Sequence, residues 1–412
     1  MPNEQKTILI IGTYDTKDSE LSFIADCIQA EGGKVIRMDV GVLGEPVSEI
    51  DISKEEVAAQ GGSSIPEIIS FNDENLAMQA MAKGAANLAL DLYTDNQMHG
   101  VIILGGTMGT DLALEVCQAL PIGIPKQVVS TVSFSPMIAP SRLAADIQMT
   151  LWAGGLYGLN SICKSSLSLA AGAVLGAARS AKPWNKSKPV VGMTSFGSTV
   201  LTYMIKLLPE IEKRGFELAV FHATGMGGMA FDNLARKGVF SCVMDFAPQE
   251  ITNLVYGSVL SAGENRMLGA GLSNTPQIVA PGCIDLIDFP TWQDPPAVFE
   301  GREFHAHNRL ICSAGLTREE RCRVGREICD RISQSRAPVN LIVPNVGIQG
   351  WDKEGQPFYD PEAQMALVKE FRSSCKPPVK LTELDCHIND QEFADKALKI
   401  FDQWLDEGII TS

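Results

Sequence analysis

The first loop of the sequence carries charged and hydroxyl side chains directly after an apolar run. The run, residues 8–11, stops at Gly12, and Thr13, Asp15 and Lys17 follow within five residues. A lysine pairs with phosphate, whereas a carboxylate repels phosphate unless a cation lies between them or it binds a sugar hydroxyl. Mg²⁺ is usually held by one or two carboxylates together with phosphate oxygens. The loop therefore predicts a polyphosphate site in which Asp15 is the metal ligand.

A second loop, with the sequence GGTMGT, follows another buried run and precedes a helical pattern that starts near Thr110 or Asp111. Glycines allow close approach of a ligand to the backbone, and the free N–H groups of a helix start attract anions, most often phosphate. The alternative is a tight turn of the kind found in any α/β protein. We expect the residues of this loop and of the next strand end to bind the cofactor: Gly105, Gly106, Thr107, Gly109, Thr110, Ser130 and Thr131.

Two familiar nucleotide motifs are missing. The sequence has no G-x-x-x-x-G-K-[ST], and its first predicted strand is not followed by G-x-G-x-x-G. Asp39 ends the second predicted strand, where such folds bind a ribose hydroxyl, and we include it among the cofactor residues, although a capping role is equally compatible. Thr16 and Asp18 could simply cap the first helix.

Four of the five histidines lie in the second half of the chain: His222, His305, His307 and His387. His305 and His307 would face the same side of a strand. A lone histidine is more often a satisfied core or capping residue, but four in so histidine-poor a chain suggest a shared cleft. Histidine titrates near neutral pH and can both give and take a proton. The sequence has no H-E-x-x-H and no G-x-S-x-G, so a histidine-rich metal site and a serine hydrolase are less favoured.

Other polar residues fall at apparent strand ends or helix starts of the second half, among them Glu250, Asp285 and Ser261. Such groups could run general acid–base chemistry on a carboxylated or phosphorylated metabolite. The expected catalytic residues are His222, His307, Asp245 and Glu264. The expected substrate-binding residues are Gly225, Gly227, Gly228, Arg266 and Asn308.

Short apolar runs alternate with amphipathic stretches along the whole chain. This alternation predicts parallel, doubly wound α/β sheets, because strands buried on both faces form continuous apolar runs. The predicted strands are residues 7–12, 34–40, 100–106 and 127–132 in the first half and 189–195, 217–223, 240–246, 276–282 and 339–345 in the second.

A polar, proline-containing stretch at residues 178–189 is typical of a linker. It predicts two domains, residues 1–180 and 189–412. Ligands of open α/β sheets bind beyond the carboxyl ends of the strands, so we expect a ligand cleft between the two domains.

Composition narrows the function classes. The chain has 412 residues, a net charge of −15 and ten cysteines without a C-x-x-C pair. This much acid argues against binding to nucleic acid or to an anionic membrane. The N-terminus is polar and has no secretory signal, which predicts a reduced, cytoplasmic protein. The small-residue stretch at residues 167–178 is expected to be a buried helix or, less often, a subunit interface.

Six motifs resemble the family of the plant tobamovirus-resistance protein: GTYDTKDSEL, LGGTMGT, LPIGIPKQVVSTV, VFHATGMGG, HAHN and HINDQEFAD. They occur in the family's order over nearly the whole chain. The resemblance implies two Rossmann-like domains, a homodimer and ATP binding by the N-terminal domain, but no established reaction. The plant protein inhibits viral replication by binding a viral replication protein, a role that a bacterial-type member has no reason to share.

Three departures from the family pattern matter. Met108 stands where the family has glycine, and Cys283 stands where alanine is usual, which argues against Cys283 as a nucleophile. Residues 347–354 differ from the corresponding stretch of the family pattern. It is therefore in doubt whether the functional roles of that stretch apply to this chain. The sequence leaves two function classes open, an ATP-binding enzyme that acts on a small anionic metabolite and a nucleotide-responsive regulatory or protein-binding module.

Overall fold

The computed structural model describes residues 5–182, 184 and 187–411, and the chain forms two compact units, residues 1–184 and 185–412. We call them the N-terminal and the C-terminal unit. The predicted linker overlaps the last helix of the first unit, and its residues 183, 185 and 186 lie outside the described residues.

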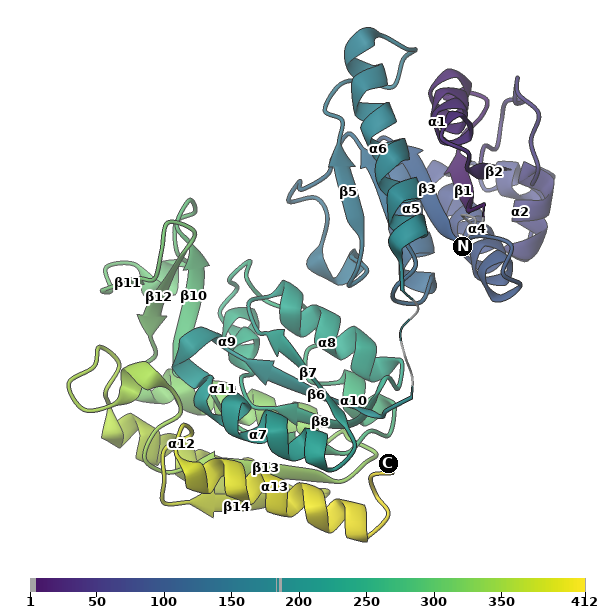
Figure 1. Ribbon diagram of the computed structural model, residues 1–412. Coiled ribbons are helices and arrows are strands. Elements are labelled where there is room, and N and C mark those ends of the chain that lie inside the picture. Colours follow the sequence, from purple (N-terminus) through teal and green to yellow (C-terminus); the bar gives the residue numbers. More distant parts are fainter. Residues whose placement is uncertain (1–4, 183, 185–186, 412) are drawn as a thin grey trace. The chain divides into compact units, whose positions relative to one another are not determined.

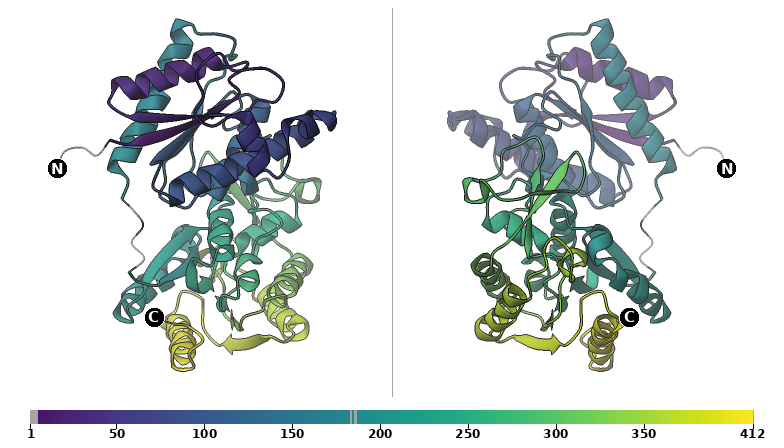
Figure 2. Two further views of the ribbon diagram at one scale, coloured as in Figure 1. Left: turned by 90° about the vertical axis from the view of Figure 1, so that its right-hand side faces the viewer. Right: turned by 90° about the vertical axis from the view of Figure 1, so that its left-hand side faces the viewer.

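The N-terminal unit is a five-stranded sheet, here sheet A, with the strand order β2-β1-β3-β4-β5 and parallel pairing throughout. Figures 1 and 2 show its strands between the helices. The strands are β1 Thr7–Gly12, β2 Lys34–Asp39, β3 Gly100–Gly105, β4 Lys126–Ser130 and β5 Gln148–Leu151; the helices are α1 Asp18–Ala30, α2 Lys54–Gln60, α3 Ile65–Ser70, α4 Glu74–Thr94, α5 Thr107–Ala119 and α6 Ser161–Ser180, with a 3₁₀ turn, η1 Pro140–Arg142.

Alternate residues of β1 bury themselves on opposite faces of sheet A. Ile8 and Ile10 pack with α1 and α6, whereas Leu9 and Ile11 pack with α2, α4 and α5. Both faces of the strand are therefore covered, which explains why its sequence is an unbroken apolar run. The doubly wound architecture predicted from that run is confirmed.

Helix α6 contains the small-residue stretch. By length and composition it is the one helix of the described residues that could cross a membrane. Seven of its residues, from Cys163 to Ala178, are nevertheless buried against the rest of the unit. We therefore interpret α6 as a core helix, whose alanines allow close packing on sheet A.

The C-terminal unit contains a six-stranded parallel sheet, sheet B, in the order β14-β13-β9-β8-β6-β7, and a three-stranded antiparallel sheet, sheet C, in the order β10-β12-β11. Figure 1 shows sheet C projecting from the body of this unit. The strands are β6 Val190–Ser195, β7 Glu217–His222, β8 Phe240–Asp245, β9 Gln277–Val279, β10 Leu286–Pro290, β11 His305–Ala306, β12 Ile311–Gly315, β13 Val339–Pro344 and β14 Val379–Leu384. The helices are α7 Thr202–Lys213, α8 Met226–Arg236, α9 Gln249–Val255, α10 Gly269–Leu272, α11 Arg318–Ile332, α12 Pro361–Ser374 and α13 Gln391–Asp406, with the 3₁₀ turns η2 Gly197–Val200, η3 Ala297–Phe299 and η4 Gly350–Asp352.

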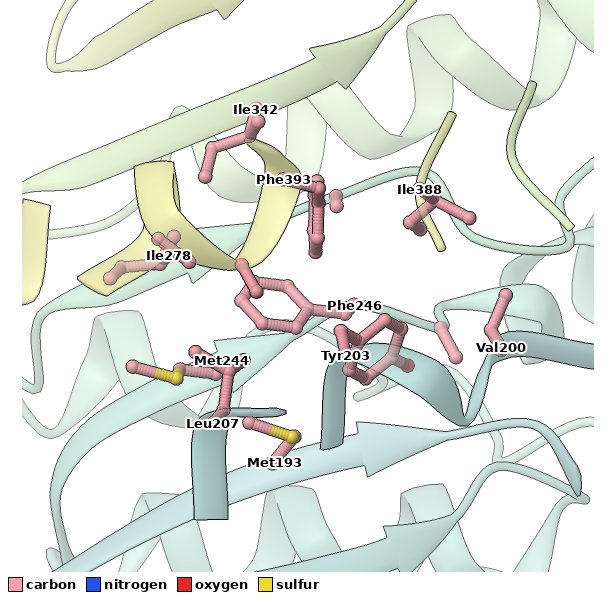
Figure 3. Packing of buried hydrophobic residues seen from close by; sticks show 14 of the residues in the cluster. Met193, Val200, Tyr203, Leu207, Met244, Phe246, Ile278, Ile342, Ile388 and Phe393 are labelled. Carbon is pink, nitrogen blue, oxygen red and sulfur yellow. The ribbon is translucent and has the colours of Figure 1, made fainter. Parts of the chain in front are cut away.

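Three aromatic side chains fill the centre of the core between sheet B, α7 and α13. Figure 3 shows Tyr203, Phe246 and Phe393 together, and the rings of Tyr203 and Phe393 both lie within 6 Å of the Phe246 ring, at 5.2 and 5.1 Å between centroids. The Tyr203 hydroxyl donates to the backbone oxygen of Thr194 at 2.8 Å. The core thus fixes the end of β6, and with it the loops that follow.

Candidate functional site

The two loops that carry the phosphate-type residues meet in one pocket. Strands β1 and β3 are neighbours, with Ile11 paired to Ile103, so their carboxyl ends lie side by side. This is the point where the strand order of sheet A reverses, the usual ligand position in open α/β sheets. A pocket of about 860 Å³ lies there, lined by Gly12, Thr13, Asp15 and Lys17 of the first loop and by residues 105–109 of the second.

Helix α5 begins earlier than its sequence pattern predicts, at Thr107 instead of near Thr110. Gly106 precedes the helix without a side-chain cap, and the Thr110 N–H donates to the Gly106 oxygen at 2.8 Å. The N–H groups of the first helical turn have no partner within the helix and need one from elsewhere. Since residues 107–109 line the pocket, these donors are available to an anionic ligand.

Glycine is required at two positions of this loop for different reasons. A Cβ atom on Gly105 would lie 2.5 Å from the Cα of Gly109, so the close packing of β3 on α5 needs a glycine there. A Cβ atom on Gly106 would meet only the Thr131 hydroxyl, at 3.9 Å. Gly106 therefore borders open space. A larger residue would fit the fold there but would take up space in the pocket.

Asp15 and Lys17 both line the pocket but differ in how they are held. The Oδ2 atom of Asp15 accepts from the Gly44 N–H at 3.3 Å, and its buried Oδ1 atom has no hydrogen-bond partner within the described chain. Lys17 donates to the backbone oxygen of Leu156 at 3.2 Å, and its Nζ lies 5.7 Å from the centre of the Tyr157 ring. Oδ1 is thus the oxygen of this carboxylate that lacks a hydrogen bond, and it lies below the surface of the pocket wall.

The capping roles considered for the first loop are not formed. Lys17 takes the N-cap position of α1 without a side-chain bond. Thr16 instead shares a hydrogen bond with the Thr13 hydroxyl at 2.9 Å, and Asp18 accepts from the Ser48 backbone N–H at 3.0 Å. The first turn of α1 is therefore uncapped, like that of α5.

Four predicted cofactor residues do not line the pocket: Asp39, Thr110, Ser130 and Thr131. The first three brace the loops instead. Asp39 is only 1% exposed, and its Oδ1 accepts from the N–H groups of Tyr14 and Gly41 at 3.1 and 2.9 Å. Burial raises the pKa of the Asp39 carboxyl. The hydroxyls of Thr110 and Ser130 are buried and bond to each other at 2.6 Å. Asp39 thus holds together the loops that follow β1 and β2.

The rest of the pocket is apolar and was missed in the sequence. These residues come from the loop after β2 and from α3, α4 and α5. They form no sequence motif, because apolar residues of this kind are also expected in an ordinary core. The lining includes Val42, Leu43, Ile68, Ile69, Ala77, Met78, Met81, Met108 and Leu112, with Asn72, Asp73 and Glu74 as further polar members.

In the C-terminal unit, Arg266 is fully enclosed and cannot hold a substrate as we expected. Its guanidinium bonds to Glu250 at 2.7 Å, to Asp245 at 2.8 Å and to Asp232 at 3.3 Å. Asp245 also accepts from the Thr194 hydroxyl at 2.7 Å. Asp245 is therefore part of an internal ion cluster and not an exposed catalytic acid.

The second glycine loop, after β7, is filled by the protein itself. The carboxylate of Glu250 accepts from the N–H of Gly228 at 3.0 Å and from the N–H of Gly225. A Cβ atom on Gly228 would overlap Glu250, and one on Gly227 would lie 1.7 Å from the His222 oxygen. The loop hence admits an internal carboxylate at Gly225 and Gly228, whereas Gly227 packs against the backbone of β7. The substrate role predicted for the three glycines is not supported.

Of the two histidines proposed for proton transfer, His222 packs on an aromatic ring at the end of β7 and His307 lies beside Trp351. The half-exposed His222 ring stacks on Phe196 with 6.0 Å between centroids, and its Nδ1 lies 3.1 Å from the Thr224 hydroxyl. Partial burial, and then the nearby charge of His307, lower the pKa of His222. The rings of His305 and His307 lie 4.7 and 5.9 Å from the Trp351 ring.

The remaining predicted residues of this unit lie elsewhere or have structural roles. His387 is buried, with Nε2 at 2.8 Å from the Gln349 oxygen and Nδ1 accepting from Asn389, as a satisfied core histidine does. Asn308 accepts from the N–H groups of residues 310 and 311 and so closes a turn. Glu264 has an exposed side chain, and only its backbone oxygen is bonded, by Arg331. In addition, the described residues contain no cluster of three or more side chains suited to a metal.

The segment that departs from the family pattern turns out to support the histidines. Trp351, which contacts His305 and His307, belongs to it, and so does Gln349, whose amide donates to the buried Asp285 at 2.9 Å. No local sequence pattern predicts this contact, because it joins residues more than forty positions apart.

Comparisons with known proteins place the chain in a family. Models of the N-terminal and C-terminal domains of the uncharacterised protein family UPF0261 match residues 6–183 and 188–405. A family protein of Brucella melitensis is 47% identical over 403 residues, which are 98% of this chain and 96% of that protein. The ToMV resistance protein Tm-1 of Solanum lycopersicum is 30% identical over 96% of this chain, which spans 55% of that protein. The structure of an A-type ketoreductase from a modular polyketide synthase covers 92% of this chain and 89% of that one, with 9% identity and a TM-score of 0.21. The motifs, both domain matches and the relatives agree that the chain belongs to the UPF0261 family.

Proposed function

We propose that the N-terminal unit binds a nucleoside triphosphate with Mg²⁺, and that the nucleotide is ATP, as the family resemblance implies. One observation carries this proposal: both glycine-containing loops line one pocket at the point where the strand order reverses, next to the uncapped starts of α1 and α5. The pocket volume of about 860 Å³ falls within the range of ordinary ligand sites.

Each part of the pocket suits one part of the nucleotide. The phosphates would accept from the first turn of α5 and from Lys17. The Asp15 carboxylate would turn its buried, unpartnered Oδ1 toward the pocket to meet Mg²⁺. The apolar residues of α3 and α4 would cover the base. Mg²⁺ would neutralise phosphate charge beside Asp15, which otherwise repels the ligand.

Calorimetry with ATP and Mg²⁺ tests the placement. The Gly106→Val variant should keep the fold, because its added atoms enter open space, and these atoms would occupy the position proposed for a phosphate. We expect binding to weaken more than about tenfold, since each lost charge-assisted hydrogen bond contributes about 1.5–3 kcal/mol. Gly172→Val on α6, which also adds atoms to open space, is the matched control and should bind as the wild type does. Equal affinity of the Gly106→Val variant would refute the placement.

For the C-terminal unit we propose proton transfer on a small anionic metabolite by His222 and His307. The lowered pKa of His222, which partial burial and then the charge of His307 cause, supports this enzyme hypothesis. One observation favours the alternative, a nucleotide-responsive regulatory module. Arg266, Asp245 and Glu250 are enclosed in the protein, so most of the polar residues on which the enzyme hypothesis rested are not accessible to a substrate. The cleft shared by both units and the homodimer stay proposals.

A further inference from the structure

Two cysteines that are far apart in the sequence meet between two helices of the C-terminal unit. Cys329 lies in the last turns of α11, and Cys375 follows the last residue of α12. Their sulfur atoms are 3.1 Å apart, although 46 positions separate the residues. The spacing hides the pair from any search for C-x-x-C.

The two thiols differ in exposure. Cys329 is 1% exposed, whereas Cys375 is partly exposed and is followed by the exposed Lys376. A hydrogen bond from the Cys329 thiol lowers the pKa of Cys375, and the same bond raises the pKa of Cys329. A thiolate is the reactive form of cysteine, so Cys375 is the thiol that an oxidant in solution meets first.

We propose that Cys329 and Cys375 are a reversible oxidation site, at which a peroxide converts the two thiols into a disulfide. The Cys375 sulfur attacks one oxygen of hydrogen peroxide, the O–O bond breaks, and a sulfenic acid and water form. The Cys329 sulfur then attacks the Cys375 sulfur, the S–O bond breaks, and a second water leaves. Two thiols and one peroxide thus give one disulfide and two waters.

The placement of the pair suits this division of roles. The enclosed Cys329 is protected from direct oxidation, and it lies close enough to resolve the sulfenic acid before further oxidation. The bond would fasten the end of α12 to α11, two helices that pack against the same core of the unit. It would close a loop of 46 residues, which restricts the unfolded chain.

Peptide mapping of the full chain tests the proposal. After treatment with hydrogen peroxide and blocking of free thiols, trypsin should release residues 327–331 joined to residues 373–380, with the mass of the two peptides less two hydrogen atoms. Reduction before digestion should separate them. The oxidised protein should also melt roughly 5–10 °C higher than the reduced protein.

Variants separate the pair from general thiol oxidation. In Cys329→Ser the sulfenic acid of Cys375 has no partner and should become trappable by a dimedone probe. Cys322→Ser, on the same helix α11, should form the joined peptide as the wild type does. Absence of the joined peptide in the folded wild type, or dimedone labelling of wild type and Cys329→Ser to the same extent, would overturn the proposal.

Discussion

The charged residues of the C-terminal unit illustrate how poorly residue type alone predicts a role. Arg266 has three carboxylate partners and no exposed surface, so its guanidinium is paired entirely inside the protein. From sequence, an arginine beside acids resembles a substrate clamp. What distinguishes the two cases is solvent access, which depends on α8, β8 and α9 meeting in space.

Replacing Arg266 by methionine should therefore destabilise the protein strongly. Removal of one member of a buried ion cluster leaves uncompensated charge, and we expect a loss of about 3–5 kcal/mol in the free energy of unfolding. Chemical denaturation at neutral pH measures it. Arg372→Met breaks the half-exposed ion pair with Glu383 and should cost less than about 1 kcal/mol. Losses of similar size in both variants would contradict the structural role of Arg266.

Asp288 gives a pH-dependent test. Burial raises the pKa of its carboxyl from 3.8 to about 7, and the charge of Glu250 adds to this, while the Ser313 hydroxyl donates to it. The folded chain therefore keeps a proton that the unfolded chain releases, so this residue's contribution to stability is complete below pH 4 and is lost as the pH rises to 7. One such proton changes the free energy of unfolding by about 1.4 kcal/mol per pH unit.

Asp288→Asn should remove the contribution of this carboxyl to the pH dependence of the free energy of unfolding. Urea denaturation between pH 5 and 7.5 should show a shallower decline of stability in the variant than in the wild type. Asp406→Asn, an exposed change on α13, should leave the decline unaltered. A decline equally steep in Asp288→Asn would mean that this carboxyl does not hold the proton.

Among the elements, the two glycine loops have similar sequences but differ in what their backbone N–H groups contact. Each joins a strand to a helix start. The loop after β3 leaves its donors open to a pocket, whereas the loop after β7 receives Glu250. Both loops look alike in sequence, because the residue that fills the second one lies more than twenty positions further along the chain.

Gly228→Ala should expose this difference. The added carbon would displace the buried Glu250 carboxylate, so we expect a loss of about 3 kcal/mol in the free energy of unfolding. Thermal or chemical denaturation measures it. Gly172→Ala, in the middle of α6 with open space around it, should instead stabilise by about 0.5–1 kcal/mol. An unchanged stability of Gly228→Ala would show that the loop can accommodate the carbon.

The elements themselves were largely predictable, for a physical reason. Buried strands such as β1 and β13 are covered on both faces, so their apolar runs stand out from the amphipathic helices. Five strands were missed: β5, β10, β11, β12 and β14. They are short, lie at an edge, or belong to sheet C, and most are partly exposed. β10 is buried throughout, but Asp288 interrupts its apolar run. In the pocket, the loop residues were predictable because parallel strands end at one edge. The apolar wall was not, since it depends on how α3 and α4 pack.

At the scale of the whole molecule, the open question is whether the nucleotide and the histidines serve one reaction. If they do, binding of Mg-ATP must change the electrostatic surroundings of His222 and His307. A negatively charged ligand near an imidazole favours its protonated form and so raises its pKa. The pKa of His222 starts below its usual value, which leaves room for a rise.

NMR titration of the histidine side chains can follow this, because the chain has only five histidines. We expect saturating Mg-ATP to raise the pKa of His222 and to leave the signals of His387, which is buried and fully bonded, in place. The Gly106→Val variant should lose the effect together with ATP binding, whereas Gly172→Val should keep it. His222→Ala and His307→Ala should bind ATP as the wild type does, because neither residue lines the pocket of the N-terminal unit. If saturating Mg-ATP leaves His222 and His307 unchanged while binding is intact, the nucleotide acts without them, and the regulatory function is to be preferred over the enzyme.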